Sequence, residues 1–138
     1  WKIFFFHEGP LRRSTKQTKE WNRGAYLTQA LVHCGECHSP RNFLGAVDQR
    51  RFMAGNRDGP DGDSVPNITP DPESGIGKWS HKDIVDALQL GILPNGDFVG
   101  SAMTEVSENL ANLTDADLSS IATYIKSLPA IQNKVTGE

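Results

Sequence analysis

The stretch Cys34-Gly35-Glu36-Cys37-His38 decides how the rest of this chain is interpreted. Two thiols three positions apart, followed at once by a histidine, form the attachment signature of a c-type haem. Each thiol adds across one vinyl group of the porphyrin, and the short helical turn between them places the imidazole under the iron as proximal ligand. The stretch therefore predicts one covalently bound haem c, held by Cys34 and Cys37 and ligated by His38.

Other uses of a Cys-x-x-Cys pair fit this chain less well. A thioredoxin-like redox pair lies in a βαβ pattern, and the flanks of this pair are not strand-rich. A closed zinc site needs four ligands, and the chain has only two cysteines. A structural disulfide across three residues is a tight fit to disulfide geometry. Dithiol redox chemistry and metal binding stay as alternatives to the haem.

The composition indicates one domain with one site. A chain of 138 residues has room for a real core but little room for a second one. An apolar fraction of 37%, with loops rich in Gly and Pro, suits a domain whose core is completed by a large apolar prosthetic group. A net charge of −3 with mixed signs gives no basic stripe, so we expect no nucleic-acid partner.

The opening Trp1-Lys2-Ile3-Phe4-Phe5-Phe6 is apolar and indicates a segment that packs on something else. The chain shows no signal-peptide pattern and no apolar run that could span a bilayer, so we expect a mature or excised segment. Residues 1–19 are predicted to be either an N-terminal strap across the domain's own core or an interdomain linker. Residues 20–138 are predicted to be the domain itself.

Hydrophobic periodicity predicts three helices joined by long loops. The first covers about residues 20–33 and places Cys34 on its buried stripe. A capping-box pattern opens a second helix within residues 80–91, and acidic residues in the first turn open a third within residues 114–129. Residues 39–77 are dominated by Gly, Pro, Asn and Asp, and we interpret them as a long loop wrapped over a haem edge.

Met103 is the expected distal ligand of the iron. It lies in a Gly-Ser-Ala-Met stretch that we expect to be irregular, between the second and third helices. A methionine sulfur opposite a histidine raises the reduction potential and leaves no open coordination position. Met53 is the other candidate, but its short apolar step after Arg50-Arg51 favours loop packing.

A second histidine in place of methionine would lower the potential, but the remaining histidines are weaker candidates. His33 adjoins the attachment stretch and does not easily reach the opposite face of a haem. His81 falls in the first turn of a capped helix, and His7 belongs to the N-terminal segment. The expected ligand pair is therefore His38 and Met103.

Five acidic residues crowd one loop and raise the question of a calcium site, because hard cations take oxygen ligands. These residues are Asp58, Asp61, Asp63, Asp71 and Glu73. Their spacing does not match an EF-hand, so a solvated acidic loop is the preferred interpretation.

Three stretches, taken in order, resemble one family. They are Cys34-Gly35-Glu36-Cys37-His38-Ser39-Pro40-Arg41-Asn42, then Pro66-Asn67-Ile68-Thr69-Pro70-Asp71, then Gly75-Ile76-Gly77-Lys78-Trp79-Ser80. The chain resembles a class I cytochrome c. More narrowly, it resembles the cytochrome c domains of multi-haem subunits that accept electrons for bacterial membrane-bound alcohol, gluconate and aldehyde-type dehydrogenases. The similarity covers about residues 21–129.

The resemblance implies an all-α class I cytochrome c fold, with few helices and long loops around one haem. The first and last helices would cross at Gly24 and Tyr124. Trp79 resembles a tryptophan that packs on the haem and hydrogen-bonds a propionate; a core indole beside a capped helix is the alternative. Three residues of the second stretch would lie near the haem edge: Asn67, Ile68 and Thr69.

The expected function is one-electron transfer in the bacterial periplasm by a carrier that is not itself an enzyme. The resemblance implies a dehydrogenase or neighbouring haem as donor, another cytochrome or a terminal oxidase as acceptor, and association with a membrane complex through a partner or missing segment. The single attachment stretch leaves open one domain of a multi-haem protein or a mono-haem relative. The rival functions are a haem enzyme or gas sensor with an open or displaceable sixth ligand, and a dithiol oxidoreductase.

Overall fold

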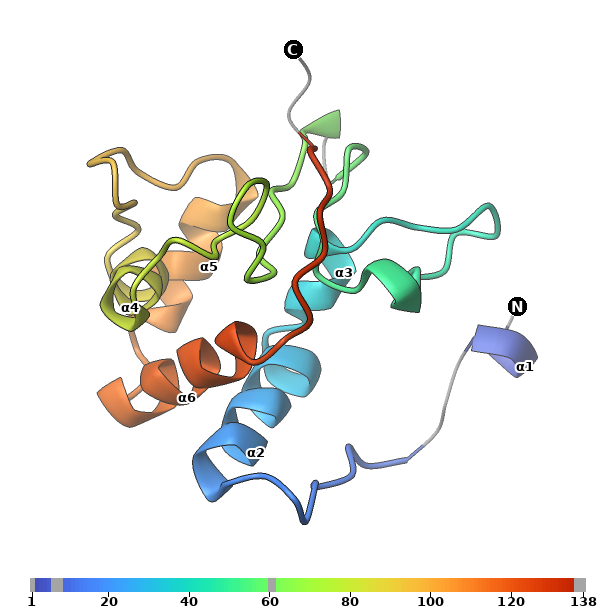
Figure 1. Ribbon diagram of the computed structural model, residues 1–138, viewed down its shortest axis with the longest axis horizontal. Coiled ribbons are helices and arrows are strands. Elements are labelled where there is room, and N and C mark those ends of the chain that lie inside the picture. The colour runs from blue at the N-terminus through green and yellow to red at the C-terminus, as the bar shows by residue number, and fades with distance from the viewer. Residues whose placement is uncertain (1, 6–8, 60–61, 136–138) are drawn as a thin grey trace.

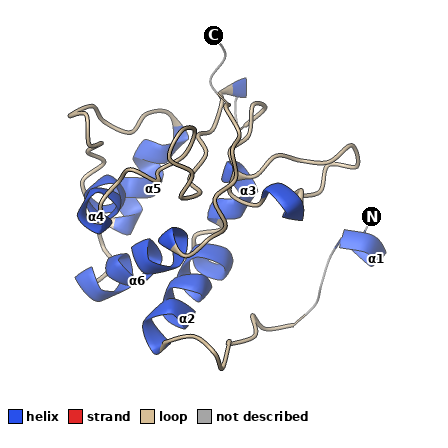
Figure 2. Ribbon diagram, in the orientation of Figure 1, coloured by secondary structure: helices blue, strands red, loops and turns tan. Residues whose placement is uncertain are grey.

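The computed structural model describes residues 2–5, 9–59 and 62–135, and the regular structure of these residues is helical (Figures 1 and 2). Three isolated β-bridges occur among them, in the loops. The all-α fold with long loops is thus confirmed. The elements are α1 (Lys2–Phe5), α2 (Lys19–Tyr26), the π-helix η1 (Leu27–Leu31), α3 (Cys34–His38), the 3-10 helix η2 (Gln49–Arg51), α4 (His81–Gln89), α5 (Ala102–Leu110) and α6 (Asp115–Lys126).

The crossing of α2 and α6 organises the fold. A Cβ atom on Gly24 would lie 1.9 Å from the carbonyl oxygen of Ser120 and 2.9 Å from Cβ of Tyr124, so only glycine permits this approach. Beside it, the Trp21 ring meets the Tyr124 ring edge-on at 5.1 Å between centroids. The Trp21 indole nitrogen also donates to Ser127 Oγ at 2.6 Å. The predicted crossing at Gly24 and Tyr124 is confirmed.

The core fills the space between α2, α4 and α6. Leu27, Leu118 and Ile121 are at most 1% exposed and form its centre. Helix α4 packs on α6 and adds Ile84 and Leu88, while α5 packs against α4. Burial of these aliphatic side chains is the main stabilising contribution, about 1.5–3 kcal/mol for each one fully removed from water.

Local hydrogen bonds fix the starts of α4 and α6 where the sequence predicts them. Ser80 Oγ accepts from the Asp83 amide at 3.1 Å, and the Asp83 carboxylate accepts from the Ser80 amide at 2.7 Å, which completes the capping box. Thr114 Oγ1 accepts from the Asp117 amide at 3.2 Å at the start of α6. Gly91 ends α4 with a φ of 67°, a left-handed value that favours glycine.

The first predicted helix, residues 20–33, is wrong in its second half. The α-helix gives way to η1, in which the Val32 amide donates to the Leu27 carbonyl at 2.9 Å, one residue further back than in an α-helix. His33 then adopts a left-handed φ of 58°, so that Cys34 begins a separate helix. Packing of η1 on α6 keeps its first two residues buried, and this tertiary contact outweighs the local helical pattern.

The expectation that Met103 lies in an irregular loop is also wrong. Met103 is in the first turn of α5, and Met103, Val106 and Leu110 follow a helical spacing that the sequence already contains. The preceding residues Gly100 and Ser101 are typical of a loop, and they favoured the loop prediction over the helical spacing. Leu110 and Ser107 are buried, which supplies the packing that stabilises this short helix.

Long loops hold themselves together by turns and bridges and surround α3. Residue pairs Arg41 with Val47, and Asn56 with Val65, form two of the isolated bridges. The Asp71 carboxylate accepts from the Ser74 hydroxyl at 2.8 Å and from its amide at 2.7 Å, which lowers the Asp71 pKa. After α6 the chain crosses these loops as an extended segment, seen in Figure 1 between α6 and the C-terminus.

The N-terminal part of the chain contributes little to the core. The side chains of Ile3 and Phe4 are 93% and 77% exposed. Asn22 ties residues before α2 to the helix, because its side-chain amide donates to the Ser14 carbonyl at 2.9 Å and its Oδ1 accepts from the Ser14 amide at 2.7 Å. The division into residues 1–19 and 20–138 stays a prediction.

The ion pair between Arg23 and Asp117 makes the α2–α6 crossing sensitive to pH. Two parallel hydrogen bonds of 2.7 and 2.9 Å join them, and donation from Arg23 lowers the pKa of Asp117. Stabilisation from a carboxylate with a lowered folded pKa is present above its unfolded pKa of about 3.9 and is lost as the pH falls through the folded value. We expect Asp117→Asn to cost about 0.5–1 kcal/mol at neutral pH, because the pair is partly exposed, and nothing below the folded pKa.

Thermal unfolding of the two proteins between neutral pH and about pH 2 checks this expectation. Asp115→Asn, in the same turn of α6 but without the Arg23 contact, is the matched control. A gap between wild type and Asp117→Asn that stayed constant down to the lowest pH would contradict the assignment to the ion pair.

Candidate functional site

Helix α3 carries the attachment stretch on a single turn. Cys34, Cys37 and His38 stand at positions i, i+3 and i+4, which are neighbours on a helix surface. The two cysteines are half-buried free thiols. Burial raises the pKa of the Cys34 thiol to about 12, the opposite of the lowered pKa that a redox-active thiol needs. This environment argues against the dithiol alternative.

His38 is held as a neutral imidazole with one nitrogen ready to bind a metal. The residue is 9% exposed, and its Nδ1 lies 2.8 Å from the Pro66 carbonyl oxygen. A carbonyl only accepts, so Nδ1 carries a proton, and in the neutral ring, which burial favours, Nε2 keeps its lone pair. Burial lowers the His38 pKa, and the Pro66 bond opposes that shift. No described residue hydrogen-bonds Nε2, which fits the donor expected of a proximal haem ligand.

An apolar hollow of about 270 Å³ lies between the chain leading to α3 and helix α5. It is lined by Leu31, Val32, Val106, Asn109, Leu110 and Leu113. Val32 precedes Cys34 by two residues, and Val106 follows Met103 by one helical turn. Both Cys34 and Met103 pack against the main core. These residues fit a flat apolar group attached at α3. Met103 lies on α5, the helix that borders the hollow on the other side.

Met53 occupies a different environment from Met103. Its side chain is 0% exposed within the core, and its backbone is fixed by the Ser39 hydroxyl at 2.9 Å and the Ile68 amide at 3.0 Å. Its φ of 61° lies in the left-handed region. These contacts support the interpretation of Met53 as a packing residue.

Trp79 lies just before α4, half-buried against the core. Its backbone is tied on both sides, since its amide donates to the Ile76 carbonyl at 3.0 Å and its carbonyl accepts from Lys126 Nζ at 2.7 Å. Among the described residues, none accepts from the indole nitrogen. That donor is therefore available for a propionate, and the role of Trp79 stays a prediction.

Asn67 and Thr69 are almost fully buried, at 2% and 0% exposure, and their side chains bind protein groups. Asn67 Nδ2 donates to the Ile131 carbonyl at 2.7 Å, and Thr69 Oγ1 donates to Asn67 Oδ1 at 2.7 Å. Ile68, between them, packs on the core. The position of these three residues near the haem edge stays a prediction. The sequence did not indicate that Asn67 and Thr69 also bind the C-terminal part of the chain.

The other histidines and the acidic loop were the remaining candidates for binding a metal. His33 is exposed, His81 Nε2 lies 3.2 Å from the Ser119 carbonyl, and His7 is outside the described residues. Asp61 is also outside them, while Asp63 accepts from Ser101 Oγ at 2.6 Å. In the described part of the chain, no three His, Cys, Asp or Glu side chains are grouped to hold a metal ion.

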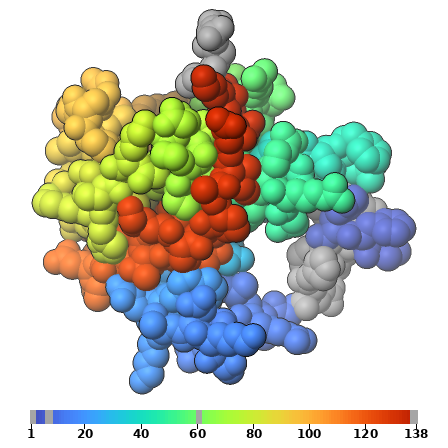
Figure 3. All heavy atoms as spheres, in the orientation of Figure 1, coloured from blue at the N-terminus to red at the C-terminus, as the bar shows by residue number. Residues whose placement is uncertain are grey.

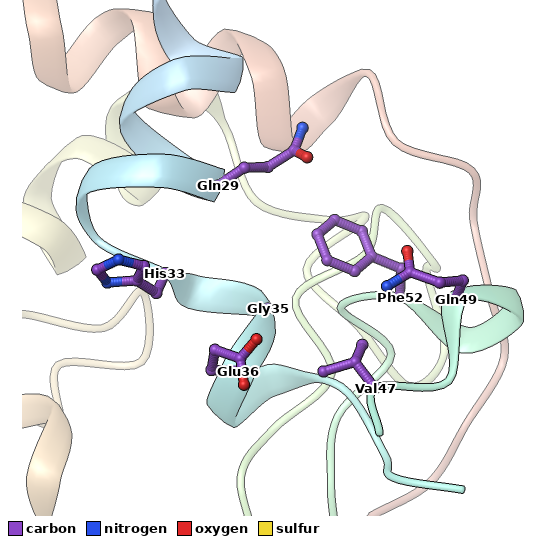
Figure 4. Close-up of a pocket in the computed structure, with 7 residues that line it drawn as sticks. All are labelled: Gln29, His33, Gly35, Glu36, Val47, Gln49 and Phe52. Atoms are coloured by element: carbon purple, nitrogen blue, oxygen red, sulfur yellow. The ribbon is translucent and has the colours of Figure 1, made fainter. Parts of the chain in front are cut away.

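A second cavity, of about 110 Å³, lies on another side of α3 (Figure 4). In Figure 4, Gly35 and Glu36 face Val47, Gln49 and Phe52 across it. A Cβ atom on Gly35 would lie 2.3 Å from Phe52 Cε2. The residue after the first cysteine is thus restricted by the Phe52 ring, a constraint that the attachment signature itself does not contain.

Comparison with known proteins decides the family, although a scan against protein-family models finds no match. The chain is 43% identical over 131 residues to the fructose dehydrogenase cytochrome subunit of Gluconobacter japonicus, which is 94% of this chain and 26% of that protein. It is 42% identical over 113 residues to a diheme cytochrome c-type protein of Cereibacter sphaeroides, 82% of this chain and 37% of the relative. The chain belongs to the cytochrome c family. The resemblance to the cytochrome c domains of dehydrogenase subunits is confirmed.

A third relative of this cytochrome is the gluconate 2-dehydrogenase cytochrome c subunit of Pantoea cypripedii, 34% identical over 117 residues, 78% of this chain and 26% of the relative. The cytochrome thus spans between about a quarter and somewhat over a third of the length of these three relatives. Within its described residues, no helix combines the length and the apolar character needed to cross a bilayer.

Proposed function

We propose that this cytochrome carries a single covalent haem c and transfers one electron at a time. The observation that carries the proposal is α3 itself, where two cysteines and a buried neutral His38 stand on one turn with Nδ1 bound to Pro66. When bound, the haem supplies one reversible Fe(III)/Fe(II) couple. The membership of the cytochrome c family and the relatives named as cytochrome subunits support this function.

The chain's own residues hold the group and limit what can reach it. Cys34 and Cys37 would form the thioether links, His38 would bind the iron through Nε2, and Met103 would bind it from α5. Two strong ligands leave no position for a substrate, which suits a carrier. Trp79 would donate to a propionate. The well-packed core between α2 and α6 would keep rearrangement small when the charge changes.

The setting of this electron transfer is proposed from the relatives. Because two of the relatives are named as cytochrome subunits of fructose and gluconate dehydrogenases, we infer a dehydrogenase or a neighbouring haem as donor. Another cytochrome or a terminal oxidase would be the acceptor, in the bacterial periplasm. Residues 20–138 would be one cytochrome domain and residues 1–19 a strap or linker, with membrane association through a partner or another segment.

The rival proposal is a haem enzyme or gas-binding protein whose sixth ligand is absent or displaceable. The position of Met103 favours the carrier. It stands in a helix that packs on α4, beside the apolar hollow, so its backbone is fixed by tertiary contacts. A ligand on a fixed helix is harder to displace than one on a loose loop.

Maturation of the chain in a periplasm that attaches haem c tests the proposed function. We expect one iron per chain and the alkaline pyridine spectrum of a c-type haem. The haem should stay attached to the chain after denaturation and acid extraction. The double variant Cys34→Ser with Cys37→Ser should lose all covalent haem, because no thioether can form. Two thiols titratable in the matured wild type, or rapid binding of carbon monoxide to the reduced protein, would speak for the dithiol or the open-site rival.

A further inference from the structure

Four segments of the chain meet around His38: the end of α3, residues 53–56, residues 66–69 and residues 131–135. The last of them, residues 131–135, is called the C-terminal clamp. In Figure 3 the C-terminal part of the chain, coloured red, lies between a yellow-green loop on one side and a blue-green loop on the other. The haem signature accounts only for α3. The buried polar contacts of the other three segments have no role in attachment, and they converge on the partner of the proximal imidazole.

The first contact runs through residues 66–69. The Pro66 carbonyl accepts from His38 Nδ1, and the next residue, Asn67, is fixed by its side chain. Asn67 Nδ2 donates to the Ile131 carbonyl at 2.7 Å and to Ser74 Oγ at 3.2 Å. Asn67 Oδ1 accepts from the Thr69 amide at 2.9 Å and from its hydroxyl at 2.7 Å. Each polar atom of the Asn67 side chain is therefore used to hold the residue that follows the acceptor.

The second contact runs through residues 53–56. The Gly55 amide donates to the His38 carbonyl at 2.7 Å, so this loop fixes the backbone of the ligand. A Cβ atom on Gly55 would lie 2.4 Å from Val135 Cγ2 and 2.8 Å from the Asn67 amide nitrogen, so the loop is pressed between the other two segments. Its φ of 87° also requires glycine.

The C-terminal clamp joins these two loops. Asn133 Nδ2 donates to the Ala54 carbonyl at 2.7 Å, and the Asn133 amide donates to Ser74 Oγ at 2.8 Å. The Ile131 amide donates to Thr69 Oγ1 at 3.2 Å, next to the carbonyl that Asn67 binds. Val135 is 5% exposed and closes the end of the contact. One short segment thus bonds both of the loops that bond His38.

We infer that the C-terminal clamp, with Asn67, Thr69 and Asn133 as positioning residues, holds the Pro66 carbonyl against His38 Nδ1 and thereby sets the reduction potential. This inference rests on the proposed function, because it takes His38 as the proximal ligand. A firmly held acceptor strengthens the Nδ1 hydrogen bond, which makes Nε2 a better electron donor to the metal. Better donation favours the ferric state. A loosened clamp should therefore raise the potential.

The experiment compares haem-loaded variants by equilibrium redox titration. Thr69→Val keeps the shape of the side chain but removes the hydroxyl that contacts Asn67 and Ile131, whereas Thr69→Ser retains it. Asn133→Ala removes the bond to Ala54. We expect Thr69→Val and Asn133→Ala to shift the potential to more positive values, with Thr69→Ser restored close to wild type. Each tenfold change in the ratio of oxidised to reduced protein corresponds to about 59 mV for one electron.

Two controls separate positioning from general stability. Gln132→Ala, at the exposed residue next to Asn133, should leave the potential unchanged. Asp117→Asn weakens the fold through an ion pair that no residue of the clamp contacts, and it should also leave the potential unchanged. The proton signal of His38 Nδ1–H in the reduced protein reports the hydrogen bond directly and should move upfield only in Thr69→Val and Asn133→Ala.

Unchanged potentials and Nδ1–H signals in folded Asn133→Ala and Thr69→Val proteins would overturn the inference. So would equal potentials for Thr69→Ser and Thr69→Val that both differ from wild type, because the hydroxyl would then not matter. Should Thr69→Val not fold, Asn133→Ala alone decides, since it removes one side-chain hydrogen bond at a half-buried residue. Failure of the proposed function shows separately, as a wild-type chain without covalent haem.

Discussion

The oxidised Met103→Ala variant is expected to lack the weak long-wavelength absorption band of methionine bound to ferric haem iron, and its potential should fall well below that of the wild type. Methionine sulfur stabilises ferrous iron, so its removal favours the ferric form. The open position should also admit carbon monoxide to the reduced variant without delay. The cost in stability should stay at about 1–2 kcal/mol, because the side chain is half-buried at the start of α5.

Met53→Leu is the matched control, since it replaces the other methionine by a residue of similar volume. Met53 is fully buried in the core, and a volume-conserving change there usually costs less than about 1.5 kcal/mol. The band should survive in Met53→Leu. Loss of the band in Met53→Leu, with a normal band in Met103→Ala, would identify Met53 as the distal ligand. Absence of the band from the wild type would favour a histidine ligand or an open site.

The second large effect is expected at Gly24. An alanine in place of glycine within a helix normally stabilises it by about 1 kcal/mol. In α2 the sign should reverse, because the added Cβ would lie 1.9 Å from the backbone oxygen of Ser120, which cannot move without shifting α6. We expect Gly24→Ala to cost at least about 3 kcal/mol and to reduce the yield of haem-loaded protein.

Chemical unfolding of the purified proteins measures this cost. Gly100→Ala serves as the control, because a Cβ there meets no atom within 4 Å, and its effect should stay within about 0.5 kcal/mol. A Gly24→Ala protein as stable as wild type would mean that α2 and α6 can separate, and the close crossing would then not be a requirement of the fold.

The parts of the fold that the sequence predicts best are those fixed by neighbours in the chain. The capping box at Ser80 and the Thr114 cap locate α4 and α6 because each depends on residues only three positions apart. The crossing at Gly24 was available only through the family resemblance, since a glycine inside a helical pattern does not by itself show which element packs on it.

The missed features depend on residues far apart in the sequence. The π-helix η1 follows from packing on α6, and the Asn67 side chain binds a carbonyl 64 residues away. No periodicity reports such contacts. The attachment residues Cys34, Cys37 and His38 form a local signature, which is why α3 was placed from the sequence while the support of its histidine was not.

The widened turn of η1 has a consequence for how chains of this kind tolerate length changes. Each residue of an α-helix advances the side chains by about 100° around the axis. Between Gly24, which faces α6, and the end of η1 at Leu31, the extra residue of η1 therefore sets the direction in which the chain leaves the helix, before the left-handed His33 turns it into α3. Removing one residue there would leave both the crossing and the cysteine pair intact but turn one away from the other. The number of residues in this stretch, more than their identity, therefore sets how α3 lies relative to the α2–α6 crossing.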